Sequence, residues 1–172
     1  AERLSRITEN LLRLTRLDGG VVQAAYPVAV GPVLQRVERM LGMVAEEKGV
    51  TISGSASEDA VALATDDDVH QILYNLMENA IKYSAAENGF VRAEALVRDG
   101  QVVITVTDNG IGIPDEDLPH VFDRFYRVDK MRSREVGGTG LGLSIVKDTI
   151  ENRGGSIQAG HGAGGMGAVF TV

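Results

Sequence analysis

Hydrophobic residues near the start of the chain recur at the spacing of one helical face. Leu4, Ile7, Leu11 and Leu14 follow one another at intervals of three, four and three, and Leu17 extends the stripe. Such a seam, flanked by charged residues, is typical of a helix that packs against another helix. At 1.5 Å per residue the stripe spans only about 25 Å, too short for an independent coiled coil. Two interpretations stay open: a piece of a longer helix, or an amphipathic helix packed on its own domain.

Periodicity divides the remainder of the chain into further helices and strands. Helices are expected at 31–47, 65–84 and 143–152, and strands at 21–25, 50–53, 60–64, 91–97, 101–107, 156–160 and 168–172. Asp99-Gly100 between two alternating strands is a strong hairpin signal. Hairpins outnumber strand–helix–strand units. The pattern therefore predicts an α+β fold, a two-layer α/β sandwich in which helices cover a mixed, largely antiparallel sheet, preceded by one amphipathic helix.

Composition narrows the classes of function. The 172 residues suit one domain with a small appendage, and the net charge of −7 argues against non-specific nucleic-acid binding. There is no cysteine, so disulfides, iron–sulfur clusters, Cys-type zinc sites and cysteine nucleophiles are excluded. No apolar run approaches the roughly 20 residues of a membrane span. Arginines in the first turns argue against a signal peptide at this start.

Polar residues that could carry chemistry lie on the helix expected at 65–84. Asn75 and Asn79 are four apart and share a face, which Lys82 and Tyr83 continue. Asparagine is a mediocre helix former, so two stacked inside a helix need a reason. Amide oxygens suit Mg²⁺, an ammonium suits phosphate, and a tyrosine ring offers a flat surface to a base. Taken alone, a solvated polar face explains the same pattern.

Two glycine-rich motifs follow. Asp108 ends a strand and opens a loop with Gly110, Gly112 and Ile113, where a carboxylate could accept a hydrogen bond from an adenine amine and glycines allow a flat ligand to approach. A tight Asx turn is the alternative. Residues 137–143 open a helix whose N-terminal N–H groups could cradle phosphates, although a hinge fits too. Their spacing matches neither the dinucleotide fingerprint nor a P-loop.

Between these motifs lies an aromatic cluster. Phe122, Phe125 and Tyr126 fall within five positions, and Arg127 is the first of several cations that follow. A lid with aromatic anchors and cations for a polyphosphate would have this composition. A small satellite core with a solvated basic loop is the alternative.

In this order the motifs closely resemble a known family. Residues 70–172 are similar to the ATP-binding catalytic domain of sensor histidine kinases, in the superfamily shared with gyrase B, Hsp90 and MutL. Residues 75–83 resemble its N box, 108–112 its G1 box, 122–126 its F box and 138–142 its G2 box. The F box points to histidine kinases over the other branches, and the lid is most similar to the phosphate-sensing class. The resemblance implies a Bergerat-type ATP-binding fold.

The resemblance also implies residue roles. Asn79, with Asn75, would hold Mg²⁺, Lys82 and Arg127 would meet the polyphosphate, and Asp108 would hold the adenine amine. Tyr83 would pack near the nucleoside, while Phe122 and Phe125 would anchor the lid. Arg127, Lys82 and Asn79 are the expected catalytic residues. The full set expected at the ATP site is Asn75, Asn79, Lys82, Tyr83, Asp108, Gly110, Gly112, Ile113, Phe122, Phe125, Tyr126, Arg127, Gly138, Thr139, Gly140, Leu141 and Gly142.

Domain organisation follows from the same resemblance. Residues 1–18 resemble the end of the second helix of the dimerisation and phosphotransfer hairpin, and 19–172 the catalytic domain, with an ATP lid at about 114–140. The implied reaction transfers the γ-phosphoryl of Mg-ATP to a histidine, for relay to a response regulator receiver domain. His70, His120 and His161 lack the context of the acceptor histidine. We therefore expect a fragment that does not phosphorylate itself, monomeric or weakly dimeric, from a homodimeric kinase.

The family implies a cytoplasmic domain whose parent protein is often anchored in the bacterial inner membrane. Two other functions stay open. An anti-sigma-type serine kinase shares the nucleotide fold, but the heptad helix and the F box count against it. A nucleotide-sensing domain without transfer is not favoured, because all four boxes look intact. A dinucleotide-binding dehydrogenase is disfavoured by the glycine spacing and the hairpin topology.

Overall fold

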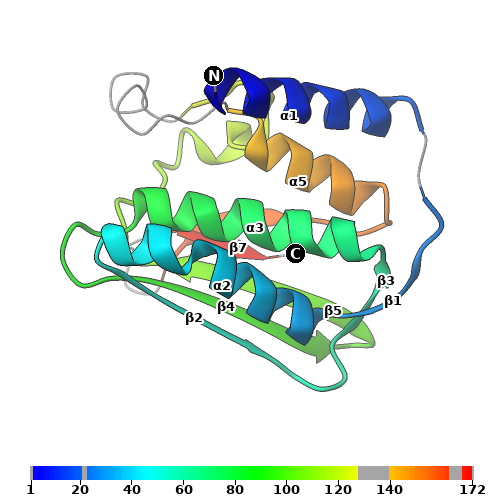
Figure 1. Ribbon diagram of the computed structural model, residues 1–172, viewed down its shortest axis with the longest axis horizontal. Helices are drawn as coiled ribbons and strands as arrows, with labels where there is room; N and C mark the ends of the chain where they lie inside the picture. Colours follow the sequence, from blue (N-terminus) through cyan, green and yellow to red (C-terminus); the bar gives the residue numbers. More distant parts are fainter. Residues whose placement is uncertain (1, 21–22, 128–139, 163–167, 172) are drawn as a thin grey trace.

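The computed structural model describes residues 2–20, 23–127, 140–162 and 168–171 (Figure 1). Its helices are α1 (Glu2–Asp18), α2 (Val30–Glu47), α3 (Asp66–Tyr83) and α5 (Gly142–Glu151), with a 3-10 turn at η1 (Leu118–His120). Its strands are β1 (Tyr26–Ala29), β2 (Val50–Ala56), β3 (Val61–Ala64), β4 (Gly89–Arg98), β5 (Gln101–Asp108), β6 (Gln158–His161) and β7 (Ala168–Thr171).

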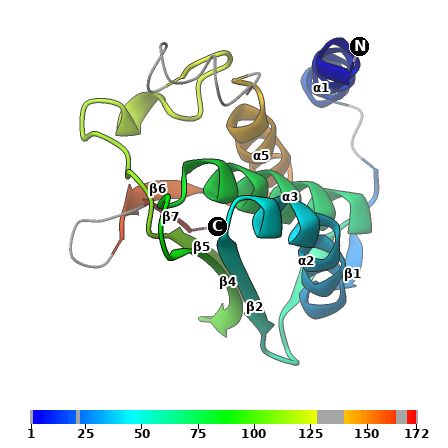
Figure 2. The same ribbon diagram turned by 60° about the vertical axis from the view of Figure 1, so that its left-hand side comes forward.

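The main sheet has the strand order β2-β4-β5-β7-β6. Only β2 and β4 pair in parallel, and the other neighbours are antiparallel. Helices α2, α3 and α5 lie over one face of this sheet, and α1 is outermost, beside α5 (Figures 1 and 2). β1 and β3 form a separate two-stranded sheet. The predicted α+β sandwich with a mixed, largely antiparallel sheet is confirmed.

The hairpin of β4 and β5 forms the centre of the sheet. Asp99 and Gly100 both have positive φ, of 52° and 75°, which is the geometry of the type I′ turn that Asp-Gly favours. Alternate residues of β4, Val91, Ala93 and Ala95, are fully buried beneath the helices. The burial of every second residue is what a strand with one covered face shows.

Helix α3 begins with a capping box. The Thr65 hydroxyl accepts a hydrogen bond from the Asp68 N–H at 3.1 Å, and the Asp68 carboxylate accepts one from the Thr65 N–H at 3.1 Å. Seven apolar residues of the helix are buried in the core: Val69, Ile72, Leu73, Leu76, Met77, Ala80 and Ile81. Helices α2 and α5 and the sheet cover one face of α3. The polar N-box residues lie on another face, which is available for other contacts.

Two strand predictions were displaced along the chain. The strand expected at 21–25 is wrong, because residues 23–25 have no regular structure and β1 starts at Tyr26, where pairing with β3 begins at Ala64. The strand expected at 156–160 starts at Gln158 instead. Gly154 has a φ of 79°, and the Gly155 N–H donates a hydrogen bond to the Ile150 carbonyl at 3.0 Å. These residues therefore terminate α5, and the strand begins after them.

Helix α1 rests on the domain through a small apolar contact. Leu14 is buried in a cluster with Leu141 and Ile145 of the α5 region, whereas Leu4 and Leu11 of the same stripe are exposed. The helix thus packs on its own domain at Leu14, whereas Leu4 and Leu11 of the predicted seam stay exposed. None of the described helices is long and apolar enough to cross a membrane.

His70 gives the fold a predictable acid sensitivity. Burial lowers the pKa of His70 below 6.5, Arg36 and Arg13 lower it further, and Asp67 and Asp66 oppose the shift. The unfolded chain therefore binds the proton more tightly, so the free energy of unfolding falls as the pH drops below 6.5. Urea titrations at about pH 7.5 and about pH 5.5 should show a smaller loss in His70→Gln than in the unchanged protein. An equal loss in both would contradict this assignment.

Candidate nucleotide site

The two asparagines of the N box lie in the second half of α3, where Asn75 faces the start of α5. A Cβ added to Gly142 would lie 3.8 Å from the Asn75 Oδ1. The Asn75 Nδ2 is buried and has no hydrogen-bond partner within the described part of the chain. A buried amide without a partner costs free energy, so a polar ligand group between α3 and the N-terminus of α5 would satisfy it. Asn79 is half-buried one turn further along the helix.

Two lysines meet at the C-terminal end of α3. The Lys82 ammonium lies 3.0 Å from the Glu78 carboxylate, one helical turn back. Lys48, which follows α2, donates hydrogen bonds to the carbonyls of Ile81, at 3.0 Å, and of Lys82. Burial lowers the pKa of Lys48, and the nearby Lys82 lowers it further. This end of α3 therefore carries two positive charges against one carboxylate.

The loop after β5 is fastened at three points. Asp108 is buried, and one of its carboxylate oxygens accepts a hydrogen bond from the Gly110 N–H at 2.9 Å. The Asn109 amide accepts one from the Phe90 N–H at 2.8 Å and donates one to the Asn88 carbonyl at 2.9 Å. The G1 carboxylate is thus held in a fixed position beside the first residues of β4.

Gly110 has a different role from the one expected. A Cβ added there would lie 1.6 Å from the Tyr83 carbonyl oxygen, and the next N–H, of Ile111, donates to that oxygen at 3.2 Å. The backbone of α3 therefore already requires glycine at this position. Gly112 has a φ of 72°, which glycine adopts without strain. Ile113 is half-buried against the main core.

The F box contacts the G2 box through the backbone. The Phe125 N–H donates to the Gly140 carbonyl at 2.9 Å, and a Cβ on Gly140 would lie 2.8 Å from the Phe125 Cα. The two ends of the segment 126–139 are held together by this contact. Gly138 and Thr139, which are also expected at the ATP site, lie outside the described residues.

The aromatic anchors differ from one another. Phe122 packs half-buried against the main core, as an anchor should. The expectation for Phe125 is wrong as far as its side chain is concerned, because that side chain is 60% exposed. The Tyr126 hydroxyl donates to the Asp117 carboxylate, which raises the pKa of Tyr126. Arg127 is half-buried next to it.

Leu141 is a packing residue. Its side chain is fully buried in the cluster that holds Leu14 of α1, so only its backbone could face a nucleotide. The structure therefore brings the four boxes together by three contacts: Gly110 on Tyr83, Gly142 beside Asn75, and Gly140 on Phe125.

Sequence reasoning missed the residues that hold this site in place. Asn109, Glu78 and Lys48 had no signal of their own, because each acts on a partner that only the fold brings near. Asn109 lay inside the G1 motif, where only its turn propensity was considered.

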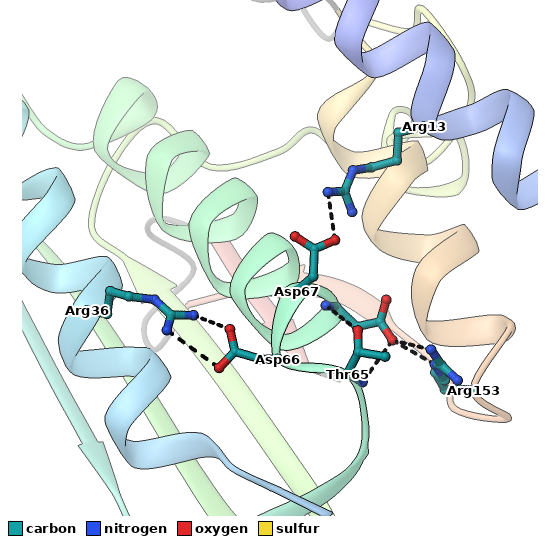
Figure 3. Close-up of polar contacts among 7 residues, drawn as sticks. Arg13, Arg36, Thr65, Asp66, Asp67 and Arg153 are labelled. Carbon is teal, nitrogen blue, oxygen red and sulfur yellow. Dashed lines mark hydrogen bonds and ion pairs between the residues drawn. The ribbon is translucent and has the colours of Figure 1, made fainter. Parts of the chain in front are cut away.

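The first turn of α3 carries a second polar network at the opposite end of the helix. Arg36 of α2, Arg13 of α1 and Arg153 after α5 approach it from three elements (Figure 3). A groove of about 660 Å³ lies between α1, this turn and the end of α5, and no residue of the four boxes lines it. This network holds the first turn of α3 in place and includes no residue of the nucleotide motifs.

No cluster of three or more acidic or histidine side chains that could hold a metal occurs among the described residues. At the N box, Asn75 and Asn79 could supply amide oxygens to a metal, beside the oxygens of a bound ligand. That donor set fits Mg²⁺ bound together with a phosphate chain, because Mg²⁺ takes oxygen ligands and keeps few protein ones.

Residues 64–172 match the sequence model of a family described as histidine kinase-, DNA gyrase B- and HSP90-like ATPases. The chain belongs to this family. It is 37% identical over 161 residues to the sensor histidine kinase WalK of Bacillus subtilis, covering 92% of this chain and 26% of WalK. It spans less than half the length of the curated relatives it matches, from 19% to 44%.

Solved structures of histidine kinases are similar to this chain as well. The crystal structure of full-length ShkA in complex with AMPPNP superposes with a TM-score of 0.83 at 30% identity, over 98% of this chain and 35% of that one. Histidine kinase ThkA, in complex with the response regulator TrrA, gives a TM-score of 0.77 at 22% identity, over 99% of this chain and 47% of that one, which shows the shared fold. Within its family, this chain corresponds to the ATP-binding catalytic domain of sensor histidine kinases.

Proposed function

We propose that this chain binds Mg·ATP between the second half of α3, the G1 loop and the N-terminus of α5, and presents the γ-phosphoryl group to a histidine. The observation that carries the proposal is the buried Asn75 Nδ2, which has no partner among the described residues and lies where the N box approaches Gly142 of the G2 box. The backbone N–H groups of a helix N-terminus favour phosphate there. The likeness to ShkA, solved with AMPPNP, an ATP analogue, supports the same site.

Each residue has a role that its position allows. The buried Asp108 accepts a hydrogen bond from the adenine amine, and Gly112 and Ile113 continue the base side of the site. Asn79 and Asn75 supply oxygens for Mg²⁺. Lys82 and Arg127 neutralise the phosphate chain, together with the backbone of the G2 box.

The transfer itself is a displacement at phosphorus. A histidine ring nitrogen forms a bond to the γ-phosphorus, the bond to the bridging oxygen breaks, ADP leaves with that electron pair, and the ring proton passes to solvent. Such a reaction depends on positioning and on charge neutralisation rather than on covalent help from the protein. The chain's residues therefore act by holding the nucleotide in line with an incoming histidine.

The remaining assignments follow from this function. Residues 1–18 end the second helix of the dimerisation and phosphotransfer hairpin, and 19–172 form the catalytic domain with its lid at 114–140. The phosphoryl group passes from the acceptor histidine to a response regulator, as the ThkA–TrrA complex suggests. The parent protein is a homodimer anchored in the bacterial inner membrane, with this domain on the cytoplasmic side.

The test is a calorimetric titration of Mg·ATP into the protein and into Asp108→Asn. The variant should bind at least about tenfold more weakly, because a buried charge-assisted hydrogen bond is worth about 1.5–3 kcal/mol. Asp99→Asn, in the exposed hairpin turn, makes the same chemical change away from the site and should bind as the unchanged protein does. A folded protein that binds no Mg·ATP would refute the function.

A further inference from the structure

The carboxylate of Glu78 stands between helix α1 and the lysine of the proposed phosphate site. One of its oxygens lies 3.0 Å from the Lys82 Nζ and 3.6 Å from an Arg6 guanidinium nitrogen. Glu78 is 17% exposed, whereas the Arg6 side chain is 56% exposed. A well-shielded carboxylate is thus shared between a cation of the site and a cation brought by another helix.

Helix α1 is held in the position that makes this possible. Leu14 is buried beside α5, Arg13 pairs with Asp67 at 2.9 Å, and Asp18 makes two hydrogen bonds, of 2.7 and 3.0 Å, with Arg124. Arg124 directly precedes Phe125 in the F box. The contacts of α1 therefore reach both the helix of the N box and the base of the lid.

We propose that Arg6 is a positioning residue for the nucleotide site, acting through Glu78 on Lys82. With α1 docked, Arg6 attracts the Glu78 carboxylate, so that Glu78 holds the Lys82 ammonium less tightly. The ammonium can then turn more easily toward a phosphate. With α1 displaced, Glu78 loses Arg6, keeps its hydrogen bond with the Tyr74 side chain and its ion pair with Lys82, and holds that lysine more tightly. Docking of α1 thereby raises the affinity for nucleoside triphosphates. This inference rests on the proposed function.

The physical basis is competition for one charge. A carboxylate flanked by two cations binds each less tightly than it would bind one alone, since the cations repel each other. Because Arg6 is exposed and salt screens it, the effect is modest, corresponding to about a two- to fivefold change in dissociation constant. Because the proposed function places Lys82 at the phosphate chain, the binding of adenosine alone should be unaffected.

The experiment measures dissociation constants for Mg·ATP and for adenosine with the whole chain. Arg6→Ala should weaken Mg·ATP binding about two- to fivefold and leave adenosine binding unchanged. Glu78→Gln should strengthen Mg·ATP binding, and adding Arg6→Ala to it should then have no effect. Arg6→Lys should restore most of the affinity. Arg16→Ala is the matched control, since it removes the same charge from an exposed position of α1 about 15 Å further along.

Several results would overturn the inference. They are equal effects of Arg6→Ala and Arg16→Ala, an Arg6→Ala effect that persists beside Glu78→Gln, or an equal loss of adenosine binding. These outcomes would leave the proposed function standing, provided the unchanged protein binds Mg·ATP. Absence of Mg·ATP binding by the unchanged protein would instead refute both.

Discussion

Replacing Gly110 by alanine is expected to lower the free energy of unfolding by at least about 3 kcal/mol, the upper range for overpacking a well-packed site. The new Cβ would lie 1.6 Å from the Tyr83 carbonyl oxygen and 2.8 Å from the Ser84 Cα. Both neighbours are backbone atoms, so no side chain can turn aside to make room. The G1 loop and the end of α3 must therefore separate.

That separation would also disturb the proposed nucleotide site. The Gly110 N–H orients Asp108, and the Ile111 N–H bonds the Tyr83 carbonyl, so the carboxylate and the N box would move apart together. Chemical denaturation gives the stability, and calorimetry with Mg·ATP gives the affinity. We expect both to fall in Gly110→Ala.

The matched control is Gly42→Ala, inside α2. Nothing lies within 4 Å of the Cβ position at Gly42, so alanine there should raise stability by about 0.5–1 kcal/mol through its helix propensity. If the free energy of unfolding of Gly110→Ala were unchanged, the loop would tolerate the methyl group. The glycine would then serve another purpose.

Local chemistry accounts for what the sequence predicted well. Asp99-Gly100 specified its own turn, and local periodicity specified the helix expected at 65–84 and the strands expected at 91–97 and 101–107. Each signal depends on residues a few positions apart. The order of four motifs was informative because each is a local pattern tied to a strand end or a helix end.

What the sequence could not predict depends on partners far along the chain. β1 formed at Tyr26 because β3 pairs there, and Gly110 proved to need its small size because of α3. An aromatic residue such as Phe125 was expected to anchor the lid through its ring. Instead, its backbone has a φ of 63° and hydrogen-bonds Gly140, and its ring is exposed. No pattern within a short window distinguishes these cases.

The pairing of Asp68 with Arg153, 85 residues away, is the second contact with a large expected effect. Arg153 donates through its Nε and a terminal nitrogen to one Asp68 oxygen, each at 2.7 Å, and through another nitrogen to the Gln23 carbonyl at 2.7 Å. The two side chains are 14% and 16% exposed. The same Asp68 oxygen accepts the Thr65 N–H of the capping box.

Arg153→Ala should therefore lower the free energy of unfolding by about 2–3 kcal/mol, because it leaves a mostly buried carboxylate without its cation. The first turn of α3 supplies its own controls, since Asp66 and Asp67 pair with Arg36 and Arg13 at exposed positions. Arg36→Ala and Arg13→Ala should each cost about 0.2–1 kcal/mol.

The salt dependence of stability distinguishes the shielded Asp68–Arg153 pair from the two exposed pairs. High salt should reduce the small effects of Arg36→Ala and Arg13→Ala, whereas the effect of Arg153→Ala should persist, because a pair shielded from water is screened less. Denaturant titrations at low and high salt give all three values. Equal losses for the three arginines would mean that burial does not decide their strength. In that case Arg153 would be one surface contact among several, and α3 would owe its start to the capping box alone.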